Sequence, residues 1–561
     1  MEEENKSVSF GVAGIKDIIE AKKKEAKGKG LSFKPYVEDV RTRLGKVEEK
    51  RASIIKATNE KSYKRLREQN KWTARERIEN FFDKGTFNEY SIFAESQVKD
   101  MGMDKYSTPA DGVIIGSGEV NGRPVCSYAT DYMVLAGSSG EGHMLKVRNI
   151  TRMACEMRVP IVAFIDSAGA RLNESQPCFR AYAEIFWLQS MYSGVIPQIS
   201  VICGGCAAGQ AYSPLLTDFV IMDRNVATRM WLGGPRATAA TTTSEDITEI
   251  GGADYHMMHT GSCHFAVDDE HEASEVAKKL LTYLPSNNKE LPPYVKPSDD
   301  PKRQEERLLD ILPKDPRRSY DMHEIIQLIT DNGEFLELQS NYAKSAIVGF
   351  CRFDGHVCGI VAGNPAYIAG CMEPNSCDKY TRFITFCDAF NIPLVYLVDM
   401  PAILVGDEWE RKGTIRHGTK LLHTTCTATV PRISILVRKA YGGTTVVFCA
   451  KPYVADFVFV WPTGEHTPMG ADGAISIIYN REIEALPTSE ERLAFAEAKK
   501  KEYFDNYTDP LVTGANMRYD LFDDIIDPRR TREVIINSLK LARNKTPLVP
   551  IPDRKHGNKP V

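Results

Sequence analysis

The sequence predicts an α/β protein built from two copies of one domain, and three observations support this prediction. The apolar run RVPIVAFID, which ends at Asp166, recurs as NIPLVYLVD, which ends at Asp399, and 399 − 166 is 233. The run VIPQISVI around Pro197 recurs as TVPRISIL around Pro431, and 431 − 197 is 234. From about residue 111 onward, short β-rich runs alternate with helical stretches, which is typical of α/β domains. A constant step over two blocks indicates duplication of a whole domain, because a solenoid would repeat every 20–50 residues or so.

Four segments follow in chain order. Residues 1–70 are rich in Lys and Glu, with apolar residues at loose helical spacing, and predict an N-terminal helical arm with a solvated face. Residues 71–290 hold the first α/β copy, with strands predicted near residues 113–115 and 125–128 and a helix near 142–157. Residues 291–320 are rich in Pro, Lys, Asp and Glu and predict a linker. Residues 321–561 hold the second copy, which ends in a Pro-rich, basic tail that we expect to be extended.

The composition is that of an ordinary globular enzyme. Hydrophobic residues make up 42% and charged residues 26% of the 561 residues. A net charge of -4 gives no general attraction to nucleic acid or to acidic membranes. No run of about 18 uncharged apolar residues occurs, so we expect no direct membrane insertion. The 13 cysteines follow no disulfide-scaffold rhythm, which favours a reducing, cytoplasmic location.

In both copies the second repeated strand runs into small residues: CAAG at 206–209 and AYGG at 440–443. In the first copy a predicted helix follows. Bare backbone N–H groups at the start of a helix bind an anion or a developing oxyanion. Small side chains let a ligand carbonyl approach the main chain closely. The alternative is a tight packing turn, which the matching positions in both copies make less favoured.

The first repeated strand also leads into small residues, DSAGAR at 166–171. Arg171 could bind a phosphate or a carboxylate. The second copy reads DMPAI at 399–403 and lacks the arginine, so the first copy looks better suited to a charged ligand. The alternative is that Asp166 and Asp399 cap helices and bind no substrate. The loop AGSSGEGH at 136–143 opens another predicted helix, but it matches neither G-x-x-x-x-G-K-[ST] nor G-x-G-x-x-G.

Other chemistries have weaker support. Cys203 and Cys206 form a C-x-x-C, but the second copy reads VRKA at this place, which disfavours a redox pair. His256, His259 and His264 have metal-like spacing, but no Cys or carboxylate set completes a zinc site, and no metal is predicted. No G-x-S-x-G elbow occurs.

Taken together, these motifs resemble the carboxyltransferase (β) subunits of biotin-dependent acyl-CoA carboxylases, the propionyl-CoA and acetyl-CoA carboxylase group. The resemblance runs from about Lys71 to the C-terminus. Its landmarks are TARERI (73–78), GSSGE (137–141), DSAGAR (166–171), GVIPQI (194–199), YSP (212–214), CDAFNIP (387–393), IRHG (415–418), RKAYGG (438–443), WPT (461–463), MGA (469–471) and RKHGN (554–558). It implies two tandem crotonase-like (ClpP/crotonase ββα spiral) domains behind an N-terminal helical arm. It also implies a homo-hexamer, a trimer of dimers, with active sites between the first copy of one subunit and the second copy of another.

The resemblance implies a function as well. The chain would move CO2 between N1-carboxybiotin and the α (or vinylogous) carbon of an acyl-CoA thioester. Biotin would be carried by a partner, a biotin carboxyl carrier or biotin carboxylase subunit, since this chain has no Met-Lys-Met acceptor segment. The first copy would bind the coenzyme A thioester and the second copy carboxybiotin. Biotin itself would handle the proton, in agreement with the absence of an obvious acid–base pair in the motifs.

The site residues are carried over from the same resemblance. Backbone oxyanion holes for the thioester enolate and the biotin ureido oxygen are implied at Ala208, Gly209, Gly443 and Thr444. Substrate-binding residues are implied at Gly137, Ser138, Ser139, Gly140, Ala168, Gly169, Ala170 and Arg171. Biotin-binding residues are implied at Ala402, Ile403, Gly442, Thr445 and Val446.

The sequence departs from the family pattern where substrate would bind. The usual double Gly before Ala-Arg is Ala168-Gly169, and the usual Pro-Gly-Phe is PAI at 401–403. The family's Ala-Gly-Gly reads AAG in this chain at 207–209, and the family's Gly-Gly-Ala-Tyr-Asp reads GGTTV at 442–446. The last position, which the family associates with acyl-chain preference, is the apolar Val446. We therefore hypothesise that the acyl group is not simply propionyl.

Three alternatives stay open at this point. The same half-reaction in reverse would make the chain a subunit of a biotin-dependent decarboxylase or transcarboxylase. A crotonase-type hydratase or isomerase would need positioned carboxylates near the glycine turns. A non-catalytic scaffold would not need the donor loops.

Overall fold

The structure is a computed structural model that describes residues 17, 19–24, 38–174, 176–234, 250–315, 318–515 and 520–546. The chain forms two compact units, Met1–Ala57 and Thr58–Val561. In the first unit, helix α2 (Val40–Lys56) begins after Asp39, whose carboxylate accepts hydrogen bonds from two first-turn amides. The predicted C-terminal tail and its landmark RKHGN lie outside the described residues. No described helix is long and apolar enough to cross a membrane.

The second unit begins with α3 (Glu60–Glu68) and contains both predicted copies, which we call the N-half (residues 71–290) and the C-half (residues 321–546). Each half has one eight-stranded sheet, in the order β1-β2-β3-β4-β5-β6-β8 or β16-β14-β13-β12-β11-β10-β9, with β7 or β15 added beside β5 or β13. The N-half strands are β1 (Asn88–Tyr90), β2 (Val113–Val120), β3 (Arg123–Thr130), β4 (Ile161–Ser167), β5 (Gln198–Ala207), β6 (Phe219–Asp223), β7 (Arg229–Trp231) and β8 (Phe265–Val267). The C-half strands are β9 (Phe335–Leu338), β10 (Ala346–Phe353), β11 (His356–Gly363), β12 (Leu394–Met400), β13 (Arg432–Tyr441), β14 (Phe457–Val460), β15 (Glu465–Thr467) and β16 (Asp524–Ile525). The predicted duplicated α/β fold is therefore confirmed.

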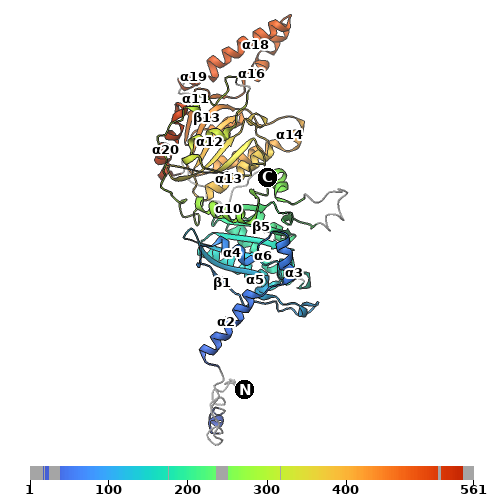
Figure 1. Cartoon of the computed structure of the whole chain (residues 1–561). Coiled ribbons are helices and arrows are strands. Elements are labelled where there is room, and N and C mark those ends of the chain that lie inside the picture. Colours follow the sequence, from blue (N-terminus) through green and yellow to red (C-terminus); the bar gives the residue numbers. More distant parts are fainter. Residues whose placement is uncertain are drawn as a thin grey trace, which may run out of the picture. The chain divides into compact units, whose positions relative to one another are not determined.

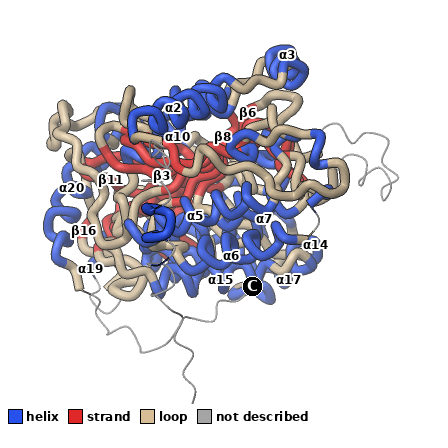
Figure 2. Tube along the Cα trace, turned by 90° about the horizontal axis from the view of Figure 1, so that it is seen from below, coloured by secondary structure: helices blue, strands red, loops and turns tan. Residues whose placement is uncertain are grey.

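Helices enclose the sheets, which appear as strands between layers of helix in Figure 2. In the N-half they are α4 (Ala74–Phe81), α5 (Glu141–Met157), α6 (Pro177–Met191), α7 (Gly209–Leu216), α9 (Ala253–Tyr255) and α10 (Glu270–Tyr283). From the linker onward they are α11 (Arg307–Asp310), α12 (Met322–Ile329), α13 (Pro374–Ala389), α14 (Asp407–Arg411), α15 (Thr414–Thr427), α16 (Ala471–Ile478), α17 (Asn480–Ala485), α18 (Ser489–Tyr503), α19 (Pro510–Ala515) and α20 (Thr531–Leu541). Helices α16 and α18 lie at the end of the C-half that is farthest from the N-half (Figure 1).

Local sequence explains the two hairpins that start the sheets. Asn121-Gly122 joins β2 to β3, and Asp354-Gly355 joins β10 to β11. All four residues have positive φ. This is the backbone of a type I′ turn, for which Asn-Gly and Asp-Gly are the preferred sequences.

The repeated apolar runs form the central parallel strands. Every residue of β4 and of β12 is buried, as expected for parallel strands covered on both faces. Ile161 of β4 pairs with Gln198 of β5, and Leu394 of β12 pairs with Arg432 of β13. The register therefore repeats with the steps of 233 and 234 seen in the sequence.

The two halves share a hydrophobic core. Phe219 of β6 packs against Phe350 and Phe386 of the C-half, with ring centroids 6.1 and 4.7 Å apart. Helix α10 lies between the halves in Figure 1, and the Arg352 guanidinium of β10 donates to the carbonyl oxygen of Thr282 in α10. The halves are thus packed together by contacts far apart in sequence.

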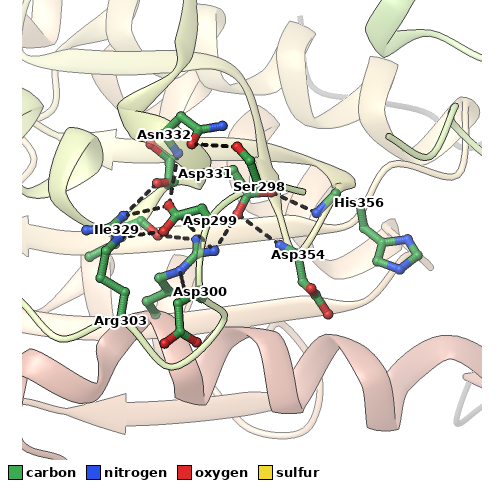
Figure 3. Close-up of polar contacts among 12 residues, drawn as sticks. Ser298, Asp299, Asp300, Arg303, Ile329, Asp331, Asn332, Asp354 and His356 are labelled. Carbon is green, nitrogen blue, oxygen red and sulfur yellow. Dashed lines mark hydrogen bonds and ion pairs between the residues drawn. The ribbon is translucent and has the colours of Figure 1, made fainter. Parts of the chain in front are cut away.

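The predicted linker is bound to the C-half (Figure 3). Arg303 donates to the carboxylate of Asp299 and to the carbonyl oxygens of Leu328 and Thr330. Asp299 in turn accepts a hydrogen bond from the amide of Asn332 at 3.0 Å. The charged residues of the linker therefore pair with one another and with the C-half rather than only with solvent.

Candidate active site

Each half has the predicted strand–turn–helix at the same place. Strand β5 ends at Ala207 and α7 begins at Gly209; strand β13 ends at Tyr441 and helical structure begins at Gly443, leading into the π-turn η8 (Thr445–Cys449). The residue between strand and helix has φ of 53° at Ala208 and 54° at Gly442. Because 442 − 208 is 234, the two turns are copies of one another.

The hydrogen bonds at these turns identify the free donors. The amide of Ala208 donates to the carbonyl oxygen of Trp231 in β7 at 3.1 Å, and the amide of Gly442 donates to that of Thr467 in β15 at 3.0 Å. In the described part of the chain, the next amides, of Gly209 and Gly443, have no hydrogen-bond partner. They are the first amides of their helices, which lack an intrahelical acceptor.

This pattern bears on the four implied oxyanion donors, which stay predictions. The Ala208 amide is bonded to the Trp231 carbonyl oxygen, so within the N-half turn the Gly209 amide is the one left to donate to a ligand. In the C-half, the amides of Gly443 and Thr444 are both without a partner among the described residues. The hydroxyl of Thr444 is buried and unpartnered as well.

The two implied substrate-binding loops of the N-half, residues 137–140 and 168–171, lie side by side in a parallel β-bridge, and two loops of the C-half, residues 370–373 and 401–404, do the same; we call them the bridged loops. Ser139 donates its amide to the carbonyl oxygen of Gly169 at 2.8 Å, and Arg171 returns an amide to Ser139 at 3.0 Å. In the C-half, Met372 makes the same pair of bonds with Ala402 and Leu404. The bridged loops are therefore a duplicated backbone feature.

A glycine is required where one bridged loop of each half passes the end of a central strand. Gly137 has φ of +65°, and a Cβ there would stand 2.1 Å from the carbonyl oxygen of Asp166. Gly370 has φ of +77°, and its Cβ would stand 2.5 Å from that of Asp399. Gly137 and Gly370 are thus explained by close packing and positive φ, independently of any ligand.

Arg171 is not placed as a free cation. Its guanidinium is buried and donates to Asp111 Oδ1 at 2.7 Å, to Glu174 Oε1 at 2.6 Å and to the Ser138 carbonyl at 2.9 Å. Two carboxylates therefore already neutralise the Arg171 side chain within the fold, and its contact with substrate stays a prediction. Ser138, Ser139 and Gly140 pack around the same network; a Cβ on Gly140 would meet Glu174 Oε2 at 2.4 Å.

The repeated aspartates are buried in ion pairs and do not cap helices. Asp166 pairs with Lys71 at 2.5 Å and with Arg77 at 3.3 Å. Asp399 pairs with Arg438 of β13 at 2.9 Å, and burial raises the pKa of Asp399 although Arg438 opposes this. Both carboxylates are thus held in ion pairs, and the second oxygen of Asp399, Oδ1, is buried without a hydrogen-bond partner among the described residues.

A cavity of about 830 Å³ opens beside the C-half turn. Three of the implied biotin-binding residues, Gly442, Thr445 and Val446, line it. Its other lining residues come from β15 and from the helices that follow: His466, Thr467, Pro468, Ile475, Ile478, Tyr479, Lys499, Glu502, Tyr503, Tyr507, Thr513 and Leu521.

The remaining two implied biotin-binding residues, Ala402 and Ile403, do not line this cavity. The Ile403 Cδ1 atom is 3.2 Å from the position that a Cβ on Gly443 would take, and Ala402 is the preceding residue. Ile403 therefore packs beside Gly443.

His466 was missed by sequence reasoning. Its imidazole is buried, and neither ring nitrogen has a hydrogen-bond partner among the described residues. Burial lowers its pKa to about 4, so the ring is neutral at neutral pH. Nothing in the run WPTGEHT distinguishes a buried histidine from an exposed one.

The other candidate groups serve structure. Burial raises the pKa of the Cys206 thiol, and the chain places Cys203 and Cys206 apart as free cysteines. His256 contacts Thr260 and the Met230 carbonyl, and His264 accepts a hydrogen bond from the Val220 amide. Across the described ranges, no group of three or more His, Cys, Asp or Glu could hold a metal ion.

Comparison with known proteins gives consistent matches. The family model for the carboxyl transferase domain matches residues 65–559. The propionyl-CoA carboxylase carboxyltransferase subunit of Haloferax mediterranei is 41% identical over 521 residues, covering 92% of this chain and 99% of that protein. The methylmalonyl-CoA decarboxylase subunit alpha of Veillonella parvula is 40% identical over 525 residues, covering 93% and 99%.

A solved structure matches equally broadly. The transcarboxylase 12S crystal structure, a hexamer with hydrolysed methylmalonyl-coenzyme A bound, has a TM-score of 0.88 and 38% identity, covering 94% of this chain and 100% of that chain. The prediction of two tandem crotonase-like domains is confirmed by this match.

Proposed function

Because the chain belongs to the carboxyl transferase domain family, we propose that it moves a carboxyl group between biotin and the α (or vinylogous) carbon of an acyl-CoA thioester. The class of reaction, biotin-dependent acyl-CoA carboxyl transfer, is that of the family. The finer assignments that follow, from donors to partners, are our proposal.

The observation that carries the proposal is the duplicated pair of unpartnered amides. The Gly209 amide would donate to the thioester carbonyl oxygen, and the Gly443 and Thr444 amides to the ureido oxygen of biotin. Such donors are preorganised, because neighbouring hydrogen bonds from Ala208 and Gly442 hold each turn in place. Loss of one such donor typically costs about 10²–10³ in rate.

The C-half site fits the biotin ring system. Its cavity is lined largely by apolar and aromatic side chains, and Gly442, which precedes the free Gly443 amide, is one of the lining residues. Biotin, when bound, supplies the carboxyl group and the proton acceptor. The chain's own residues bind and orient the ring system and exclude water. Thr445 donates its hydroxyl to the Ala440 carbonyl oxygen at 2.8 Å and so presents its methyl group.

No protein carboxylate is required as a base, which separates this function from a crotonase-type hydratase. A hydratase or isomerase needs a free acid–base group near the turn. Asp166 and Asp399, at the ends of β4 and β12, are both ion-paired. The unpartnered amides likewise argue against a non-catalytic scaffold.

We propose that the chain works as a homo-hexamer, a trimer of dimers, with a biotin carboxyl carrier or biotin carboxylase subunit as its partner. Helices α6 and α7 carry large apolar side chains at the surface, which suits coverage by another subunit. These side chains are Phe179, Trp187, Met191, Tyr212 and Leu215. The free cysteines are in keeping with a reducing, cytoplasmic location.

The acyl group and the direction are part of the proposal. We retain the hypothesis that the preferred acyl group is not simply propionyl, since the apolar Val446 stands at the position that the family associates with acyl-chain preference. Carboxylase and decarboxylase relatives are almost equally similar to this chain, so the same site would serve the reverse reaction in a decarboxylase or transcarboxylase.

The test uses the purified chain without any partner. Malonyl-CoA, methylmalonyl-CoA and larger homologues are incubated with and without free biotin, and CO2 release is measured. We expect CO2 loss that depends on biotin and is fastest for a substrate other than methylmalonyl-CoA. Loss without biotin, or none with any thioester, would reject the function; fastest loss from methylmalonyl-CoA would reject only the acyl hypothesis.

A further inference from the structure

The C-half donor turn lies against a bend at residues 467–469, where β15 ends. Thr467, the last residue of β15, accepts the amide of Gly442 at 3.0 Å. The carbonyl oxygen of the next residue, Pro468, would stand 3.1 Å from a Cβ on Gly442, so it also lies against the turn. Proline has no N–H, and the pairing of β15 with β13 ends at Thr467. The position of this bend therefore sets the position of Gly442 and of the free amides that follow it.

A tyrosine hydroxyl from α18 binds both ends of the bend. The hydroxyls of Tyr503 and Thr467 share a hydrogen bond at 2.7 Å. The Tyr503 hydroxyl also donates to the Met469 carbonyl oxygen, in a longer bond of 3.3 Å. The two bonds span Pro468, so a single side chain joins the residue before the proline to the residue after it.

Helix α18 is attached to the C-half by other contacts as well. Phe495 packs edge-on against Tyr479, which follows α16, with ring centroids 5.9 Å apart. Lys500 forms an ion pair with Asp472 in the first turn of α16. Tyr503 is the last residue of α18 and therefore reaches the bend from an element that is held independently of β15.

The N-half supports the equivalent residue in a different way. Trp231 is the last residue of β7 and accepts the Ala208 amide at 3.1 Å, so it is the counterpart of Thr467. The Trp231 ring packs on Gly251, where a Cβ would stand 2.8 Å from it. An aromatic side chain thus supports the N-half acceptor by packing, whereas the C-half acceptor, a smaller threonine, is supported by a hydrogen bond from a helix 36 positions downstream.

We propose that Tyr503 is a positioning residue of the carboxyl-transfer site, whose hydroxyl holds the bend at residues 467–469 and so aims the free Gly443 and Thr444 amides at the biotin ureido oxygen. This inference rests on the proposed function. Tyr503 and Lys499, one helical turn apart on α18, both line the cavity beside the turn. The helix that forms a wall of the cavity is thus the same helix that holds the donors.

The test removes the hydroxyl and measures both the turn and the reaction. Tyr503→Phe keeps the ring, Thr467→Val keeps the branched side chain, and the double variant closes the cycle. Tyr453→Phe is the matched control, because Tyr453 is exposed and does not line the cavity. Hydrogen exchange of the Gly442 amide is followed by mass spectrometry in the absence of ligand, on peptides that cover residues 440–446. Biotin-dependent CO2 loss from malonyl-CoA and methylmalonyl-CoA gives kcat and the thioester KM.

For Tyr503→Phe we expect exchange of the Gly442 amide to be about 3- to 10-fold faster, since one hydrogen bond that supports its acceptor is lost. The kcat should fall by a similar factor, while the thioester KM stays within about twofold. The double variant should be no worse than the more impaired single variant, because both changes remove the same bond. Exchange in the copied turn, residues 206–212, should not change, and Tyr453→Phe should behave as the unaltered chain.

Three results would overturn the proposal. Unchanged Gly442 exchange in Tyr503→Phe would show that the hydroxyl does not hold the turn. Fully additive losses in the double variant would show that the two hydroxyls act independently. A raised thioester KM with unchanged kcat would make Tyr503 a substrate contact. Exchange is measured without ligand, so absence of CO2 loss by the unaltered chain would reject the proposed function separately from the link between Tyr503 and the turn.

Discussion

In the N-half, Asp166 is neutralised by Lys71 and Arg77, which reach it from outside the sheet, whereas Asp399 of the C-half is neutralised by Arg438 from the neighbouring strand. Gly204 occupies the place of Arg438 in the N-half, since 438 − 204 is 234. A Cβ on Gly204 would stand 2.3 Å from Lys71 Nζ, so a side chain there would collide with the imported cation.

The surroundings of the two donor turns differ in the same way. One bridged loop of the N-half carries Arg171, which is ion-paired with Asp111 and Glu174. The corresponding residue in the C-half is Leu404. Only the C-half turn lines the 830 Å³ cavity. The two halves keep the same donor turns and bridged loops, while the side chains around them have diverged. This difference suits two carbonyl-type ligands of different shape.

The largest expected effect on stability comes from Arg171→Leu. Removing the guanidinium leaves Asp111 and Glu174 buried without their cation, which should cost about 3–5 kcal/mol in the free energy of unfolding. Urea denaturation measures this. Arg180→Leu, which removes an exposed pair with Glu184, is the control and should cost less than about 1 kcal/mol.

A change confined to thioester binding, with stability intact, would return Arg171 to the role of a substrate contact. It would also break the contrast with Leu404. Adding Asp111→Asn and Glu174→Gln to Arg171→Leu should recover part of the lost stability, because the uncompensated charges are then gone.

A smaller effect is expected from Gly204→Ala. The added methyl group would stand 2.0 Å from Asp166 Oδ1, so the Lys71–Asp166 pair must shift, at a cost of about 1–3 kcal/mol. Gly205→Ala is the matched control, since its nearest atom would be 3.2 Å away. Equal melting temperatures for the two variants would contradict the crowding that separates Gly204 from Arg438.

The smallest effect concerns a pair at the start of each sheet. Arg75 pairs with Glu89 in the N-half, and His323 pairs with Glu337 in the C-half, at 2.9 and 3.0 Å; the sequence step is 248 for both residues. The hydrogen bond to Glu337 raises the pKa of His323 to about 9. The contribution of the His323–Glu337 pair to stability is complete below the ordinary histidine pKa near 6.5. It disappears as pH rises to about 9.

The C-half should therefore lose up to about 1 kcal/mol between pH 6.5 and 9, after allowance for solvent screening. His323→Arg should flatten this part of the stability–pH curve, because arginine keeps its charge as Arg75 does. A curve that is unchanged by His323→Arg would show that this pair does not distinguish the halves.

The sequence was sufficient to predict the duplicated sheets, because the apolar runs before Asp166 and Asp399 repeat with a constant step. It also located both small-residue turns. It could not reveal that the Ala208 amide binds Trp231, since that bond depends on how β7 is added beside β5. The pairing of Arg171 with Asp111 joins residues 60 positions apart, and His466 lies in β15, which pairs with β13 from 26 positions earlier, so neither had a local signal.

The central claim, that free amides at the turn of each half hold a developing oxyanion, is tested most directly by removing the first free N–H of each turn alone. Gly209→Pro and Gly443→Pro do this at the first helical position, where a helix needs no N–H, and Gly209→Ala and Gly443→Ala keep the donor as controls. Biotin-dependent CO2 loss should fall about 10²–10³-fold in each proline variant and far less in its alanine partner, with folding retained. Proline variants that are folded and as active as their alanine partners would contradict the account.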